Sequence, residues 1–162
     1  LARAPETERA TRHLLRTRLT WAGLGSPAPG VWVSPHAERI DEVRAALSAA
    51  GVADAQVFVG THGGHGDLRA MVRQAWDLDD VEVRYEEFLE RFGGRTRRDA
   101  LTATVELVHA WRGLAWIDPA LPDSLLPRPW SGAAAAKLFA RLHERWSPEA
   151  RAAWQALNPA EG

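Results

Sequence analysis

HAWRGLAWIDPALPDSLLPRPWSG, residues 109–132, is the stretch from which the fold of this chain can best be argued. Four prolines fall within eleven of its residues, at positions 119, 122, 127 and 129. Proline fixes φ and has no backbone N–H, so the stretch can be neither a helix interior nor a central strand. If it were a solvated linker, its leucines and Trp130 would remain in water without benefit. It therefore predicts an ordered, proline-stiffened loop that packs on a helical core.

The sequence on both sides of this loop has the periodicity of amphipathic helices. Apolar residues recur at helical spacing over residues 68–76, 81–92, 135–146 and 150–157. Between residues 96 and 114 two apolar stripes share one helix, which is typical of a helix buried between neighbours. Ser147-Pro148 is expected to end one helix and start the last one. Residues 63–162 are therefore predicted to form an all-α domain.

The first third of the chain has a mixed pattern. A helix is expected from Pro5 to Ala22, a strand at Val31–Val33, and a helix from the Ser34-Pro35 cap to Gly51. Ala55–Gly60 is expected to be a second strand, and Leu1–Ala4 the end of a strand that begins earlier. The sequence thus predicts an α+β protein. A ferredoxin-like domain with its first strand largely missing spans residues 1–62, and the glycine-rich segment 61–66 marks the boundary.

Composition excludes several classes of function. The chain has 162 residues, 46% hydrophobic and 25% charged, with a formal net charge of −1 and no cysteine. It therefore has no disulfide, no thiol nucleophile and no cysteine zinc site, and no general attraction for nucleic acid. No apolar run has the length of a membrane span, and the N-terminus does not resemble a signal peptide. We expect a cytoplasmic protein that does not bind membranes.

Catalytic and metal-binding patterns are weak. His62 and His65 have metal-ligand spacing but no evident third ligand, so a surface loop is favoured over a metal site. Asp79-Asp80 is better explained as the start of a helix than as a carboxylate pair. No serine has a His/Asp constellation around it, and there is no phosphate-binding glycine loop. The chain is predicted not to be an enzyme and to need no metal and no cofactor.

Arginine and tryptophan together suggest a different chemistry. Arg97 lies where the two-sided helix begins, and Arg112 follows Trp111 near its end. Guanidinium groups bind phosphates and indoles stack on planar rings, so a ligand with phosphates and an aromatic end would fit this junction of helix and loop. The alternative is structural: Arg112 pairs with Asp118 and holds the loop down. The residues leave both interpretations open.

An ordered series of motifs, spread over nearly the whole chain, resembles the PaaX family, the repressors of phenylacetic acid degradation. The motifs are Pro29-Gly30-Val31-Trp32-Val33-Ser34-Pro35, Ala75-Trp76-Asp77-Leu78, Tyr85, Phe88-Leu89, His109 with Arg112, Asp118-Pro119-x-Leu121-Pro122, Leu125-Leu126-Pro127 and Trp130-x-Gly132.

The resemblance implies a winged helix that binds operator DNA and precedes the residues present here. It also implies a ferredoxin-like middle domain, a helical C-terminal domain, a homodimer, and phenylacetyl-CoA as the effector that releases the repressor. The residues expected to contact the effector are Arg97, His109, Trp111, Arg112 and Trp130. The middle domain is similar to the small CRISPR adaptation nuclease. That family has its acidic metal ligand where this chain has Ala2-Arg3-Ala4-Pro5, so nuclease activity is not implied.

Three hypotheses follow. The first is the effector-sensing and dimerisation portion of a PaaX-like transcriptional repressor that responds to phenylacetyl-CoA or a related aryl-CoA. The second is a metal-dependent nuclease built on the ferredoxin-like unit. The third is a protein-interaction module that binds no small ligand.

Overall fold

The computed structural model describes residues 6–94 and 99–158, and the side chains from Ala10 onward. The helices and strands follow one another along the chain in the order α1 (Glu6–Trp21), β1 (Gly25–Ala28), β2 (Val31–Val33), η1 (Ala37–Arg39), α2 (Ile40–Ala49), α3 (Leu68–Ala75), α4 (Leu78–Gly93), α5 (Ala100–Ile117), η2 (Asp123–Leu125) and α6 (Gly132–Leu157). The chain forms two compact units. The first contains Leu1–Asp77 and Pro119–Leu125, and the second contains Leu78–Asp118 and Leu126–Gly162.

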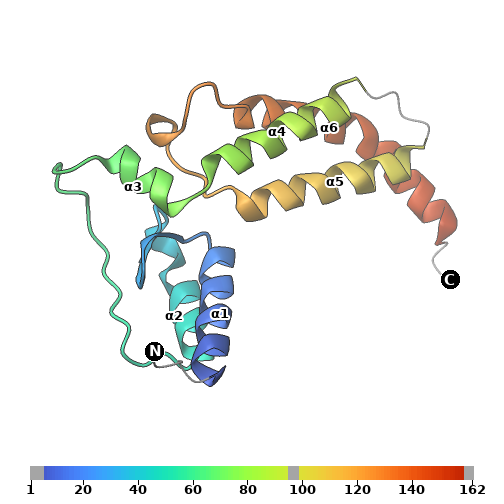
Figure 1. The fold of residues 1–162 in the computed structure, drawn as a ribbon. Coiled ribbons are helices and arrows are strands. Elements are labelled where there is room, and N and C mark those ends of the chain that lie inside the picture. Colours follow the sequence, from blue (N-terminus) through green and yellow to red (C-terminus); the bar gives the residue numbers. More distant parts are fainter. Residues whose placement is uncertain (1–5, 95–98, 159–162) are drawn as a thin grey trace. The chain divides into compact units, whose positions relative to one another are not determined.

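In the first unit, α1 and α2 lie side by side (Figure 1) and share a small core of Leu19, Ala22, Leu24 and Ala46. The antiparallel hairpin β1–β2 pairs Gly25 with Val33 and Ala28 with Val31. Its turn contains Gly30, whose φ of 77° suits glycine best, as the Pro29-Gly30 motif predicts. The predicted strand at Val31–Val33 is confirmed. β1 was not predicted, because Gly25-Ser26-Pro27-Ala28 has the composition of a turn.

The second predicted strand is wrong. Residues 55–60 pair with neither β1 nor β2, and Figure 1 shows them within the long connection from α2 to α3. Strand composition is present, but a strand also needs a neighbour to receive its backbone hydrogen bonds. The described residues therefore have an α+β organisation with one two-stranded sheet, and the ferredoxin-like arrangement is not confirmed.

Two helix starts differ from the predicted ones. Ser34 accepts a hydrogen bond from the backbone N–H of His36 at 3.1 Å, which makes a turn, and the helical conformation begins only at Ala37. The helix expected from residue 96 has its N-cap at Asp99, whose carboxylate accepts from Thr102 N at 2.6 Å. A carboxylate in this position satisfies a helix N–H that has no partner within the helix. Asp67 caps α3 in the same way.

In the second unit α4, α5 and α6 lie side by side (Figure 1) around one apolar core. The core contains Val81, Tyr85, Phe88, Phe92, Ala103, Leu107, Leu114, Ala135, Leu138, Leu142 and Trp146. The predicted helical stripes of residues 81–92 and 135–146 therefore form the core. The predicted burial of both apolar stripes of α5 is confirmed only in part: Leu107 and Leu114 are buried, whereas Val105 is 59% exposed.

The predicted break at Ser147-Pro148 is also wrong, because α6 continues through Pro148 to Leu157. Proline removes one hydrogen bond from a helix, to the carbonyl four residues earlier. Pro148 and Glu144 are both exposed, so water can reach the carbonyl that loses its partner. Trp146 and Ala150 are buried on either side of the proline, and their packing favours a continuous helix.

The predicted domain boundary after residue 62 stays a prediction. The compact units follow a different division, since α3 and residues 119–125 belong with the first unit. None of the helices in the described ranges combines the length and hydropathy that crossing a bilayer requires.

Candidate functional site

The second half of the proline-rich loop is fastened to α4 by Glu82. The Ser131 backbone N–H donates to both carboxylate oxygens of Glu82, at 3.0 Å and 2.8 Å, and the Ser131 hydroxyl donates to Oε1 at 2.6 Å. Hydrogen bonds to a carboxylate are stronger than those between neutral groups. Glu82 therefore fixes the residue that precedes α6 and, with it, the neighbouring Trp130.

Tyr85, one turn further along α4, holds the other end of the loop. Its hydroxyl donates to Oδ2 of Asp118 at 2.5 Å, directly after the end of α5. Burial raises the pKa of Tyr85, and the hydrogen bond to Asp118 and the charges of Asp118 and Glu82 raise it further. The phenol is thus kept as a hydrogen-bond donor.

Trp130 packs edge-on against Tyr85, with ring centroids 5.6 Å apart and planes at 74°. Gly132 makes this contact possible. A Cβ on Gly132 would lie 2.5 Å from Nε1 of Trp130 and 3.2 Å from the Tyr85 ring. The Trp130-x-Gly132 motif therefore has a packing reason, because only glycine leaves room for the indole.

Trp111 belongs to a row of stacked rings. It is nearly parallel to Phe139 of α6, with centroids 4.7 Å apart and planes at 12°, and Phe139 stacks on His143 at 5.4 Å. Trp111 and Phe139 are half-buried, whereas His143 is exposed. The row therefore starts in the core and ends at the surface.

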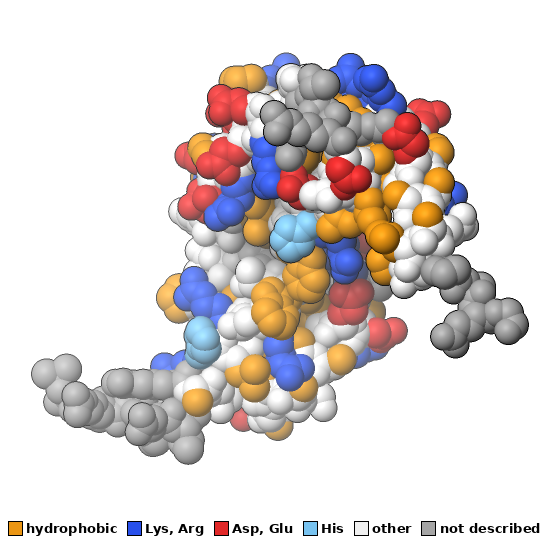
Figure 2. All heavy atoms as spheres, turned by 90° about the vertical axis from the view of Figure 1, so that its right-hand side faces the viewer, with side chains coloured by type: hydrophobic (Ala, Val, Ile, Leu, Met, Phe, Trp, Pro, Cys, Tyr) orange, Lys and Arg blue, Asp and Glu red, His pale blue; other side chains and the backbone are white. Residues whose placement is uncertain are grey.

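Next to this row, α5 has an exposed face with cationic and aromatic character. His109, Arg112 and Trp116 follow one another at i, i+3 and i+7, which places them on one side of the helix. His109 and Arg112 are exposed, and Trp116 is 56% exposed. We call these three residues the α5 stripe. On the face drawn in Figure 2, hydrophobic, basic, acidic and histidine side chains are intermixed.

The predicted site residues are therefore only partly brought together. His109 and Arg112 share the α5 stripe, while Trp111 and Trp130 both contact Tyr85 and point into the core. Arg97 lies outside the described residues. Sequence reasoning missed Glu82, Tyr85 and Trp116. The available signal for Trp116 was its helical spacing from His109 and Arg112.

A residue that the sequence did not indicate also holds the end of α5. The end of α5 is tied down by the hydrogen bond from Tyr85 to Asp118, which no sequence pattern indicates. Arg112 is exposed, and both interpretations of it stay predictions.

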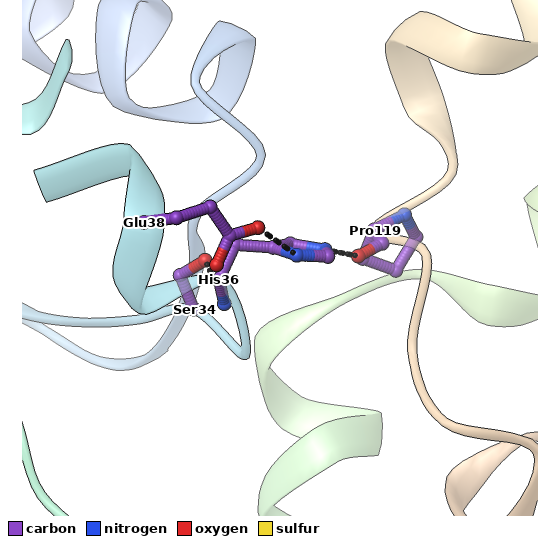
Figure 3. Close-up of polar contacts among 4 residues, drawn as sticks. All are labelled: Ser34, His36, Glu38 and Pro119. Carbon is purple, nitrogen blue, oxygen red and sulfur yellow. Dashed lines mark hydrogen bonds and ion pairs between the residues drawn. The ribbon is translucent and has the colours of Figure 1, made fainter.

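The first half of the loop belongs to the first unit, where His36 holds it (Figure 3). Nε2 of His36 lies 3.0 Å from the carbonyl oxygen of Pro119, and Nδ1 lies 3.0 Å from Oε1 of Glu38. Both partners are acceptors, so both bonds form together only when both ring nitrogens carry protons. Arg69 donates to the carbonyl of Ser124 at 2.9 Å, and Leu121 is buried. Residues 119–125 are thus attached to the first unit by backbone carbonyls and by apolar packing.

In the described ranges, no three or more histidine, aspartate or glutamate side chains gather as metal ligands would. Nδ1 of His62 accepts from the backbone N–H of Gly64 at 3.1 Å, which explains this histidine as part of a turn.

Two family models together match almost the whole chain. The model described as "PaaX protein central Cas2-like domain" matches residues 1–72, and the one described as "PaaX-like protein C-terminal domain" matches residues 76–156. Among curated proteins, "Transcriptional repressor PaaX" of Escherichia coli (strain K12) is 30% identical over 162 residues, with 90% of this chain and 50% of that protein covered. The chain thus spans about half the length of this curated relative.

Proposed function

This chain belongs to the PaaX family of transcriptional regulators, and we propose that it is the effector-sensing and dimerisation portion of a repressor. The proposed effector is phenylacetyl-CoA or a related aryl-CoA. Operator DNA would be contacted by a winged helix outside this chain, and the protein would act in the cytoplasm without catalysing a reaction.

The observation that carries the proposal is the α5 stripe of His109, Arg112 and Trp116. A CoA thioester has phosphate groups, an adenine ring and, in this case, an aryl ring. Guanidinium groups bind phosphate oxygens with two N–H donors, and indoles stack on planar rings. Arg112 is exposed, and Trp116 is 56% exposed. Both groups occur on one face of one helix, so a single ligand can engage them together.

The surroundings of the stripe support a response to binding. Trp111 follows Ala110 on the same helix and contacts Tyr85, Phe88 and Phe139, which belong to α4 and α6. A ligand that stabilises one position of α5 would therefore also bias the packing of its two neighbours. A repressor responds to an effector when the effector binds one arrangement more tightly than another.

Calorimetric titration of this chain with phenylacetyl-CoA tests the proposal, with CoA and phenylacetate titrated separately. We expect phenylacetyl-CoA to bind more tightly than either part. Arg112→Glu should weaken binding by at least ~10-fold, because it removes a charge-assisted contact and adds repulsion.

Arg151→Glu is the matched control, since Arg151 is an exposed arginine on α6 and no member of the stripe. It makes the same change of net charge and should bind as the wild-type chain does. Equal affinity of the Arg112 and Arg151 variants would contradict the stripe as the binding site. If the wild-type chain gives no binding heat and no thermal stabilisation with phenylacetyl-CoA, the effector assignment is wrong.

A further inference from the structure

The charged residues of this chain are distributed unevenly. Residues 9–37 contain four arginines and two histidines and no aspartate or glutamate, although the formal net charge of the whole chain is −1. The two acids of α1, Glu6 and Glu8, lie at its start, where the helix dipole favours negative charge. From residue 9 onward α1 therefore has only basic and uncharged side chains. A local excess of positive charge attracts polyanions even when the total charge of a protein is near zero.

One side of α1 gathers these cations. Arg12, Arg16 and Thr20 follow one another at i, i+4 and i+8. His13 lies three positions before Arg16, on the same side. All four side chains are exposed, and we call them the α1 basic face. Within the described ranges, the side chains of His13 and Arg16 take part in no ion pair and no hydrogen bond. Like charges four residues apart on a helix repel each other, so a bound anion on this side would stabilise α1.

The spacing of the α1 basic face fits a row of phosphates better than a single one. Four residues of helix rise by ~6 Å, so Arg12, Arg16 and Thr20 offer donors along a line of ~12 Å. Guanidinium groups bind phosphate oxygens with two N–H donors each, and a threonine hydroxyl donates one more hydrogen bond. A small phosphate occupies one step of that line, whereas the backbone of a nucleic acid offers phosphates along its whole length.

The apolar side of α1 argues against a membrane as the partner. A helix that binds a membrane surface buries its apolar side in the lipid. On α1 this side contains Leu19, which is buried in the core of the first unit and is therefore unavailable to lipid. DNA needs no apolar contact, since its phosphates are bound by charge and by hydrogen bonds. The curated relative is, by its name, a transcriptional repressor, which acts on DNA.

We propose that the α1 basic face binds the phosphate backbone of duplex DNA, in addition to the contacts of the winged helix. Phosphate contacts fix the position of a protein on the duplex but do not read its bases. The α1 basic face therefore supplies affinity for DNA that does not depend on sequence. This inference rests on the proposed function as a repressor that binds DNA, whereas effector binding is measured separately.

Fluorescence anisotropy tests it, with a labelled duplex of mixed sequence and about 20 base pairs, two turns of DNA, titrated with this chain. We expect binding that weakens as the salt concentration rises, because binding releases counterions from the duplex. Arg12→Gln combined with Arg16→Gln should weaken binding at least ~10-fold at low salt. The slope of log K against the logarithm of the salt concentration should become shallower by about 2, one for each lost phosphate contact.

Arg141→Gln combined with Arg145→Gln is the matched control. Both arginines are exposed on α6 and are four residues apart, so the change of charge and its spacing are the same. This variant should bind the duplex as the wild-type chain does. The absence of duplex binding by the wild-type chain, or equal losses in the two double variants, would overturn the proposal.

Two further measurements separate the partner from its alternatives. Vesicles of phosphatidylserine and phosphatidylcholine, added at the phosphate concentration of the duplex, should leave the duplex bound, and displacement by them would contradict DNA as the partner. Calorimetry with phenylacetyl-CoA should give the same affinity for the Arg12/Arg16 variant as for the wild-type chain. If the wild-type chain binds the duplex but not phenylacetyl-CoA, the effector assignment fails and the α1 basic face stands.

Discussion

Tyr85 connects α4 to the end of α5 through one hydroxyl group. Its hydrogen bond to Asp118 is short; Tyr85 is buried and Asp118 is half-buried. Tyr85→Phe removes the donor and leaves a partly buried carboxylate with one partner fewer. We expect the free energy of unfolding to fall by ~1–3 kcal/mol, measured by urea denaturation at neutral pH. Asp118→Asn keeps an acceptor oxygen and should cost less than Tyr85→Phe.

Because the pKa of Tyr85 is raised, the stabilising effect of its hydrogen bond to Asp118 depends on pH. Below about pH 10 the phenol is protonated in both the folded and the unfolded chain, so its stabilising contribution is complete. Above that value the unfolded chain loses the proton first, and stability decreases until the folded protein also ionises. Tyr85 is the single tyrosine of the chain, so phenolate absorbance reports on it alone. The phenolate should form at higher pH in the folded protein than in urea, and identical curves would contradict the assigned burial.

The start of α6 depends on a glycine that lies beneath Trp130. Gly132→Ala would place a Cβ 2.5 Å from the indole nitrogen, so Trp130 has to leave Tyr85 or the helix has to begin elsewhere. We expect a loss of ~1–3 kcal/mol in the free energy of unfolding, although alanine favours a helix. Gly113→Ala in α5 is the control, because a Cβ there meets no atom within 4 Å. It should stabilise the protein slightly, and equal effects at the two positions would contradict the packing reason for the motif.

β1 and α3 depend on a close approach at Gly25. A Cβ on Gly25 would lie 2.5 Å from the Trp76 ring and 2.7 Å from the carbonyl oxygen of Ala75. A backbone carbonyl cannot rotate away as a side chain can, so Gly25→Ala should separate α3 from the hairpin. We expect a loss of ~1–3 kcal/mol, seen in thermal unfolding. Gly63→Ala, with no atom near its Cβ position, should leave the midpoint unchanged.

Over the whole molecule, the sequence predicted the features that depend on neighbours along the chain. The predicted helical stripe of residues 81–92, with Tyr85, Phe88 and Phe92, forms part of the core. The family was also recognised correctly from its motifs. Such features follow from local spacing, which a sequence displays directly.

Features that depend on distant partners were missed. Residues 55–60 have the composition of a strand, but pairing is decided by what lies beside them. The restart of a helix at Pro148 was predicted from a local rule, and the burial of Trp146 and Ala150 outweighed it. The hydrogen bond from Tyr85 to Asp118 joins residues 33 positions apart, and no spacing indicates it. Which residues contact an effector stays a prediction.

The proline-rich loop also sets an order of events during synthesis. Residues 119–125 complete the first unit, yet they follow α4 and α5, which belong to the second. The first unit therefore cannot finish folding when residue 77 leaves the ribosome, because Leu121 and the Pro119 carbonyl have not yet been made. Completing either unit requires residues that are translated after part of the other unit. The two units therefore cannot finish folding one after the other, as two domains that are continuous in sequence can.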